Sequence, residues 1–261
     1  MKNQLDIKTR AGRSVYLLPN LLTISAMFAG FYAIIAGLQG HFVNAVIAIL
    51  MAMVLDGLDG RVARLTNTQS QFGAQLDSLS DLISFGVAPA ILLYSWTLSS
   101  LGKPGWLAAF VYTVCTALRL ARFNTQTEEH KLGCFQGLPT PAAAGFVASL
   151  VWVVTVYQWP VAVFAKPLLV LTIVLGLLKV SSFEYSSFKN IGFKDRVPFF
   201  MILVVVLILA LIALRPPELL LATGFLYIVM GPAKAVCSLV KKCPCPFKKA
   251  NKIKNKVKKN A

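Results

Sequence analysis

Four aspartates lie close together in an otherwise apolar part of the sequence. Asp56, Asp59, Asp77 and Asp81 fall within 26 residues, although the chain of 261 residues has only 10 acidic residues. Asp56 follows the apolar run 48–55, and Asp81 precedes the largely apolar residues 82–85. A carboxylate inside a membrane helix costs about 2.5–3.5 kcal/mol, so four of them need a neutralising partner. The sequence therefore predicts a cation site rather than four tolerated acids.

The spacing of these aspartates predicts that they converge. Asp56 and Asp59 are three residues apart and Asp77 and Asp81 are four apart, so each pair shares one face of a helix. Two successive helices would then bring both pairs to one point. Oxygen ligands without His or Cys suit Mg²⁺ or Mn²⁺, and Mg²⁺ commonly bridges a few carboxylates to substrate phosphates. We therefore expect a divalent cation and a phosphate-bearing substrate.

The residues between the two pairs agree with this expectation. Gly60, Ala63 and Gly73 are small and allow a ligand to approach the backbone closely. Arg64 offers a guanidinium fork for a phosphate group, and Ser70 offers a hydroxyl.

The elements that must position these residues are membrane helices. The chain is 57% hydrophobic and only 14% charged, whereas a soluble domain has about 25% charged residues. This composition excludes a soluble enzyme, a disordered chain and a small disulfide-rich domain. We predict an all-α, polytopic transmembrane bundle, because a bilayer-crossing helix needs about 20 mostly apolar residues. The eight expected spans are 17–38, 42–59, 77–98, 105–123, 141–158, 161–180, 197–214 and 217–238.

The distribution of positive charge orients this bundle. With both termini in the cytoplasm, 23 of the 26 Lys and Arg residues lie on the cytoplasmic side, and only Lys103, Lys166 and Arg215 lie on the other side. The net charge of +16 therefore predicts contact with anionic lipid headgroups and not with nucleic acid. Three parts are expected: a juxtamembrane segment 1–16, a membrane domain 17–238 and a Lys-rich tail 239–261.

The acidic stretch resembles a known signature. It reads D-x2-D-G-x2-A-R-x8-G-x3-D-x3-D, and every fixed position of the CDP-alcohol phosphatidyltransferase signature is present. The chain thus resembles that family over most of residues 15–200. Residues 18–23, 117–124 and 136–139 look like the phosphatidylserine synthase branch.

The resemblance implies roles for individual residues. Asp56, Asp59 and Asp77 would be the main metal ligands, with Asp81 helping to hold a second ion of a two-metal Mg²⁺ or Mn²⁺ site and acting as the general base. Contacts to the CDP part of CDP-diacylglycerol would come from Asn20, Thr23, Gly60, Arg64 and Ser70, with Gly73 in the same signature. Family members are typically homodimers.

The acceptor alcohol is the remaining question. The branch implies transfer of a phosphatidyl group to L-serine with release of CMP; a sister enzyme would use glycerol 3-phosphate, inositol or choline. Arg119 and Arg122 share a helix face, and either holds the serine carboxylate or a diphosphate oxygen, or both only anchor the helix at the cytoplasmic surface. Asn124 would add an amide contact.

A cation transporter is the alternative from another class. It would need acids near mid-bilayer on several separated helices, whereas these acids cluster on two neighbouring segments. We therefore expect an enzyme in the cell membrane, the inner or plasma membrane, with its active site facing the cytoplasm.

Overall fold

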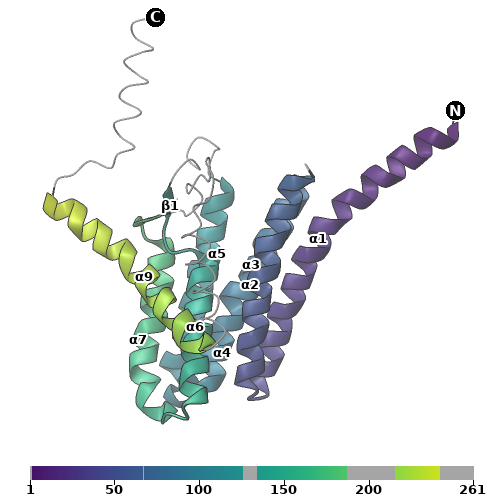
Figure 1. The fold of residues 1–261 in the computed structure, drawn as a ribbon. Coiled ribbons are helices and arrows are strands. Elements are labelled where there is room, and N and C mark those ends of the chain that lie inside the picture. The colour runs from purple at the N-terminus through teal and green to yellow at the C-terminus, as the bar shows by residue number, and fades with distance from the viewer. Residues whose placement is uncertain (1, 67, 126–133, 187–214, 242–261) are drawn as a thin grey trace, which may run out of the picture.

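The computed structural model describes residues 2–66, 68–125, 134–186 and 215–241, and these are largely helical (Figure 1). Within them, five helical segments are long and apolar enough to cross a membrane, as the composition predicts. These segments are Leu18–Leu38, Phe42–Leu65, Gln71–Trp96, Lys103–Thr125 and Val161–Val180. The first is part of the longer helix α1 (Lys2–Leu38), and α2 (Phe42–Leu65) and α5 (Lys103–Thr125) are uninterrupted.

The other expected spans have different outcomes. The helix α6 (Thr140–Val156) is apolar but has only 17 residues. The helix α9 (Pro216–Lys241) covers the expected span 217–238, yet it is not among the five spanning candidates. The expected span 197–214 lies outside the described residues, as does most of the Lys-rich tail. The helix α7 (Val161–Val180) matches its prediction.

Two predicted boundaries were wrong near the aspartates. The predicted span 42–59 continues to Leu65, and the predicted span 77–98 begins earlier, at Gln71. This second segment consists of α3 (Gln71–Asp81), a π-helical turn (Leu82–Val87) and α4 (Ala88–Trp96). The side chain of Ser70 accepts from the backbone N–H of Gly73 and thereby caps the start of α3. All four aspartates therefore belong to helices that extend beyond the expected apolar cores.

The bundle core is built from small and branched residues. The helix α2 packs against α1 on one side and α6 on the other, and α5 packs against α7. Ala45, Ile49 and Ala52 on α2 are buried, as are Ala144 and Val147 on α6. Small residues let helix backbones approach closely, which is how membrane helices associate without a hydrophobic driving force.

Large apolar side chains face outward along the same helices. Phe28, Phe31, Phe110, Val163 and Val170 are all more than half exposed. A water-soluble protein rarely presents so many apolar groups on one continuous exterior, whereas lipid tails solvate them. The exterior is thus suited to a bilayer.

Gly30 allows α1 to pack closely against the π-helical turn that follows Asp81. A Cβ on Gly30 of α1 would lie 2.7 Å from Ser84 Cα in the π-helical turn, so only glycine fits there. The hydroxyl of Ser84 donates to Ala26 O at 3.1 Å, and that of Ser80 donates to Thr23 O at 3.1 Å. The segment that carries Asp77 and Asp81 is therefore fastened directly to α1.

Two short antiparallel strands pair at the end of the bundle where the aspartates lie, one from the segment between α5 and α6 and one from the segment after α7. The strand β1 (Cys134–Gln136) pairs with β2 (Glu184–Ser186), with Phe135 opposite Tyr185. This pair is a minor addition to the all-α prediction. Beside it, Gly137 has φ +79°, and a Cβ there would lie 2.1 Å from Lys179 O.

Candidate active site

Three of the four aspartates form a compact carboxylate cluster. Asp56, Asp59 and Asp77 each place one carboxylate oxygen within 4.8 Å of the others. Asp59 is buried, and the other two are half-buried. The predicted convergence of the two helical pairs is confirmed for these three residues. A set of carboxylate oxygens without His or Cys fits a hard divalent cation such as Mg²⁺ or Mn²⁺.

Asp81 extends this cluster toward α5. Its carboxyl interacts directly with Asp56, and Arg119 on α5 is near enough to act on it electrostatically. Asp81 Oδ1 and Arg119 Nε are buried and have no hydrogen-bond partner among the described residues. Buried polar atoms are normally paired, so two such atoms of opposite charge beside one cavity indicate a place for a polar ligand.

Asp59 is held by a residue of α1. The hydroxyl of Thr23, which is buried, donates to Asp59 Oδ2 at 2.6 Å. The sequence resemblance assigned Thr23 to the nucleotide, whereas the observed contact is with a carboxylate of the cluster. Sequence spacing alone does not reveal this contact, because 36 residues separate the two positions.

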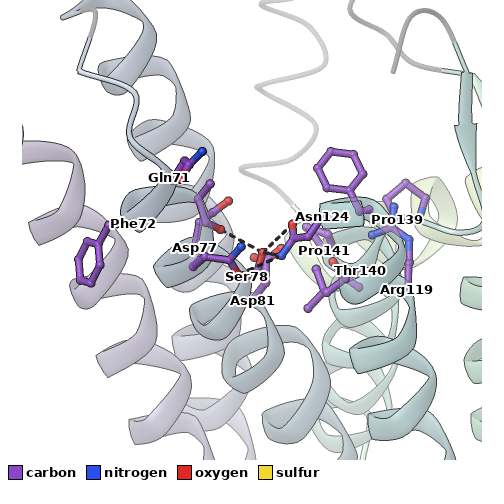
Figure 2. A pocket seen from close by; sticks show the side chains of 14 residues that line it. Gln71, Phe72, Asp77, Ser78, Asp81, Arg119, Asn124, Pro139, Thr140 and Pro141 are labelled. Carbon is purple, nitrogen blue, oxygen red and sulfur yellow. Dashed lines mark hydrogen bonds between the residues drawn. The ribbon is translucent and has the colours of Figure 1, made fainter. Parts of the chain in front are cut away.

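A cavity of about 940 Å³ opens beside Asp77 and Asp81 between α3, α5 and the start of α6 (Figure 2). Asp77, Asp81, Arg119 and Asn124 line it, four of the residues selected from the sequence. Gln75 and Ser78 also line the cavity, and the sequence analysis did not select them. Ser78 lies three residues before Asp81, and Gln75 lies three residues before Ser78, so the three share one helix face, which is the signal that would have found them.

Polar side chains join the two walls of this cavity. Asn124 Nδ2 donates to Ser78 Oγ at 3.0 Å and to Gln75 Oε1 at 3.4 Å. Ser78 Oγ lies 3.2 Å from Asn124 Oδ1 and 3.1 Å from Ala74 O (Figure 2). The predicted residue Asn124 thus contacts α3 directly. Arg122, on the same helix, is exposed and does not line the cavity.

The remaining residues that the resemblance assigns to the nucleotide lie on α1, on α2 and at the start of α3. Gly60 is exposed, and a Cβ there would meet nothing within 4 Å. The Nε of Arg64 donates to Gly60 O at 2.8 Å. Ser70 Oγ is 3.0 Å from the N–H of Gly73, and Asn20 Oδ1 would lie 3.3 Å from a Cβ on Gly73. Asn20, Ser70 and Gly73 are therefore neighbours, while Gly60 borders open space.

The strand pair contacts the helix α9. Tyr185 in β2 is buried, its hydroxyl donates to Ile228 O at 3.3 Å, and its ring packs against Tyr227 of α9 at a centroid distance of 5.6 Å. Burial, with a smaller contribution from Tyr227, raises the pKa of Tyr185 to about 12, so this hydroxyl stays protonated at neutral pH. The β2 connection is thereby attached to α9.

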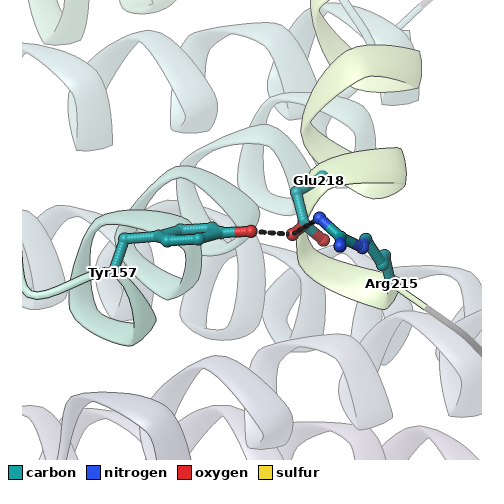
Figure 3. Close-up of polar contacts among 3 residues, drawn as sticks. All are labelled: Tyr157, Arg215 and Glu218. Atoms are coloured by element: carbon teal, nitrogen blue, oxygen red, sulfur yellow. Dashed lines mark hydrogen bonds and ion pairs between the residues drawn. The ribbon is translucent and has the colours of Figure 1, made fainter.

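A second polar cluster lies far from the carboxylates. The hydroxyl of Tyr157 donates to Glu218 Oε1, and Arg215 pairs with the same carboxylate at 3.9 Å (Figure 3). The helix α6 begins at the cavity with Thr140 and ends beside Tyr157, and its 17 residues span about 25 Å at 1.5 Å per residue. This cluster therefore links α6 to α9 at the opposite end of α6.

The apolar helices and the three clustered carboxylates together define the class: this is an integral membrane protein with a candidate site for a divalent cation. Comparison with known proteins makes the class specific. The profile of the CDP-alcohol phosphatidyltransferase family matches residues 16–178. The chain belongs to this family of membrane enzymes, as its signature predicts.

Individual relatives agree with this assignment. A CDP-diacylglycerol–serine O-phosphatidyltransferase of Helicobacter pylori is 37% identical over 227 residues, which cover 87% of this chain and 94% of that protein. A Methanocaldococcus jannaschii protein of the same name is 34% identical over 222 residues, covering 85% of this chain and 98% of that protein. A Mycobacterium leprae protein of this name is 39% identical, over 55% of this chain and 49% of its own length.

Proposed function

We propose that this protein transfers the phosphatidyl group of CDP-diacylglycerol to the hydroxyl of L-serine, giving phosphatidylserine and CMP. The observation that carries the proposal is the carboxylate cluster of Asp56, Asp59 and Asp77 beside a cavity lined by Asp81 and Arg119. The names of the relatives from Helicobacter pylori and Methanocaldococcus jannaschii support serine as the acceptor.

The donor would bind over the open face of α2. Gly60 leaves space for the CDP group, which Arg64, Ser70, Gly73 and Asn20 would contact. The acyl chains would remain in the bilayer while the nucleotide reaches the polar end of the bundle. A divalent cation held by the carboxylates would neutralise the diphosphate oxygens and the charge that builds on the departing CMP. A second ion, held with the help of Asp81, is part of the proposal.

The acceptor would enter through the cavity. Asp81, at its edge, would take the proton from the serine hydroxyl, because a hydroxyl is a poor nucleophile at neutral pH without a base. The serine oxygen forms a bond to the phosphorus attached to diacylglycerol, and the bond from that phosphorus to the oxygen of CMP breaks. Arg119 would hold the serine carboxylate, because its buried Nε lies beside the cavity and lacks a protein partner among the described residues.

The alternatives are less well supported. A sister enzyme that uses glycerol 3-phosphate, inositol or choline would share the carboxylates, but the relatives named above carry serine in their names. A cation transporter would need acids spread along several helices, whereas Asp56, Asp59 and Asp77 gather on two neighbouring ones.

The membrane arrangement is also part of the proposal. We place both termini and the active site on the cytoplasmic side of the cell membrane, because 23 of the 26 basic residues then face the cytoplasm. The Lys-rich tail would lie on the anionic leaflet. A homodimer, typical of the family, is proposed by analogy alone.

An acceptor panel with purified protein tests the reaction. CDP-diacylglycerol and Mg²⁺ or Mn²⁺ are supplied with L-serine, glycerol 3-phosphate, inositol or choline, and release of CMP is measured. We expect release that depends on serine. Release with one of the other alcohols and none with serine would identify a sister enzyme.

A further inference from the structure

We propose that Gln75, Ser78 and Asn124 form a binding subsite for a primary ammonium group and thereby select an amino-acid acceptor. The inference rests on the proposed function and goes beyond it by naming the chain's own determinants of the acceptor amine. Gln75 and Ser78 come from α3 and Asn124 from α5, and all three line the cavity beside Asp81 and Arg119. Figure 2 shows Ser78 and Asn124 in this cavity.

The hydrogen bonds of this cluster leave acceptor lone pairs open toward the cavity. Asn124 Nδ2 has two hydrogens, and they serve Ser78 Oγ at 3.0 Å and Gln75 Oε1 at 3.4 Å. The single hydroxyl hydrogen of Ser78 has two acceptors within reach, Ala74 O at 3.1 Å and Asn124 Oδ1 at 3.2 Å. When it points to Ala74 O, Asn124 Oδ1 is left without this donor.

A primary ammonium group fits the acceptors of this cluster. It has three N–H donors and no acceptor, so it matches Asn124 Oδ1, the remaining lone pair of Gln75 Oε1 and Ser78 Oγ. The 3.4 Å distance from Asn124 to Gln75 is long for an N–H···O bond, so a ligand would displace that bond at small cost. A quaternary amine such as choline has no N–H donors and could not make these contacts.

The arrangement accounts for all three polar groups of serine. Arg119 faces the carboxylate, the cluster of Gln75, Ser78 and Asn124 faces the ammonium, and Asp81 faces the hydroxyl. Inositol and glycerol 3-phosphate carry no ammonium, so they leave the cluster without a partner.

The test compares serine with 3-hydroxypropionate, which is serine without its ammonium group. Gln75→Met and Ser78→Ala each remove an acceptor. We expect the KM for serine to rise about tenfold, because hydrogen bonds to charged groups are stronger than those between neutral groups. The inhibition constant of 3-hydroxypropionate, measured in competition with serine, and the KM for CDP-diacylglycerol should stay unchanged. Gln75→Glu, which keeps an acceptor, should preserve serine binding.

Gln71→Met is the matched control, because Gln71 is on the same helix and lines the same cavity outside the hydrogen-bonded cluster. This variant should leave the KM for serine and the inhibition constant of 3-hydroxypropionate unchanged. If the Gln75 and Ser78 variants bind serine and 3-hydroxypropionate equally more weakly, the cluster only holds α3 and α5 together. If they bind serine as well as the wild type does, the cluster does not recognise the acceptor. Either result overturns the inference. A wild-type protein that ignores serine would instead overturn the proposed function.

Discussion

The hydroxyl of Thr23 donates a 2.6 Å hydrogen bond to Oδ2 of Asp59, and this bond connects α1 to the carboxylate cluster on α2 and α3. The same hydroxyl lies 3.1 Å from Pro19 O. The backbone carbonyl of Thr23 accepts a hydrogen bond from the hydroxyl of Ser80 on α3. Thr23 is therefore a junction of three helices. Its hydroxyl orients the Asp59 carboxylate toward Asp56 and Asp77.

Thr23→Val should weaken metal binding at this site. Valine keeps the shape of threonine but cannot orient Asp59, so we expect the Mg²⁺ concentration for half-maximal activity to rise about tenfold, in line with about 1.5 kcal/mol for a charged hydrogen bond. Titration of CMP release with Mg²⁺ measures this. Thr23→Ser, which retains the hydroxyl, is the control. A change in the KM for CDP-diacylglycerol with unchanged Mg²⁺ dependence would instead support the nucleotide contact implied by the family.

Asp81→Asn should separate chemistry from binding. The amide keeps the size of the side chain and loses its basicity, so we expect turnover to fall by a factor of about 10²–10⁴, which is the usual contribution of a positioned base. CDP-diacylglycerol should still bind in the presence of Mg²⁺, as measured by protection against thermal denaturation. Near-normal turnover would remove Asp81 from the role of base.

Removal of divalent cations should abolish activity reversibly. Asp56, Asp59 and Asp77 place their oxygens within 4.8 Å of one another, and close carboxylates repel unless a cation lies between them. We expect a chelator to stop CMP release and Mg²⁺ or Mn²⁺ to restore it, with the more effective ion indicating the physiological metal. Asp77→Asn should require more metal for the same rate. Full activity in excess chelator would contradict a metal site.

The carboxylate cluster can largely be predicted from residue spacing, but the hydrogen bonds between helices that hold the site together cannot. The intervals of three and four residues suffice to predict that each pair shares a helix face, because helical periodicity is local, and the convergence of Asp56, Asp59 and Asp77 then follows from pairing two successive helices. The Thr23–Asp59 bond and the Ser78–Asn124 contact join residues far apart in sequence, so they depend on how the helices pack. The apolar pattern also misplaced the ends of α2 and α3, since the helices continue through the polar residues that carry the chemistry.

Gly60→Ala should affect binding of the donor without harming the fold. A Cβ at Gly60 would meet no atom within 4 Å, and alanine favours a helix by roughly 0.5–1 kcal/mol over glycine. The melting temperature should therefore stay equal or rise slightly. The KM for CDP-diacylglycerol should increase several-fold if the nucleotide lies against this position. An unchanged KM would show that the donor does not approach α2 at Gly60.

Lys179→Met should leave the protein equally or more stable. Lys179 is buried, its Nζ donates to Thr116 Oγ1 at 2.7 Å and lies 3.3 Å from the centroid of the Tyr112 ring. In the part of the chain that the structure describes, no carboxylate forms an ion pair with it. Burying an unpaired ammonium is costly, whereas methionine fills a similar space without that cost.

The melting temperature in detergent measures this difference. We expect a rise of roughly 2–4 °C, which corresponds to about 1 kcal/mol for a chain of this size. Lys166→Met is the matched control, because Lys166 is exposed on the same helix and should change the melting temperature little. A fall for Lys179→Met alone would mean that the contacts with Thr116 and Tyr112 outweigh the burial cost. The ammonium would then be a net stabiliser of the packing between α5 and α7.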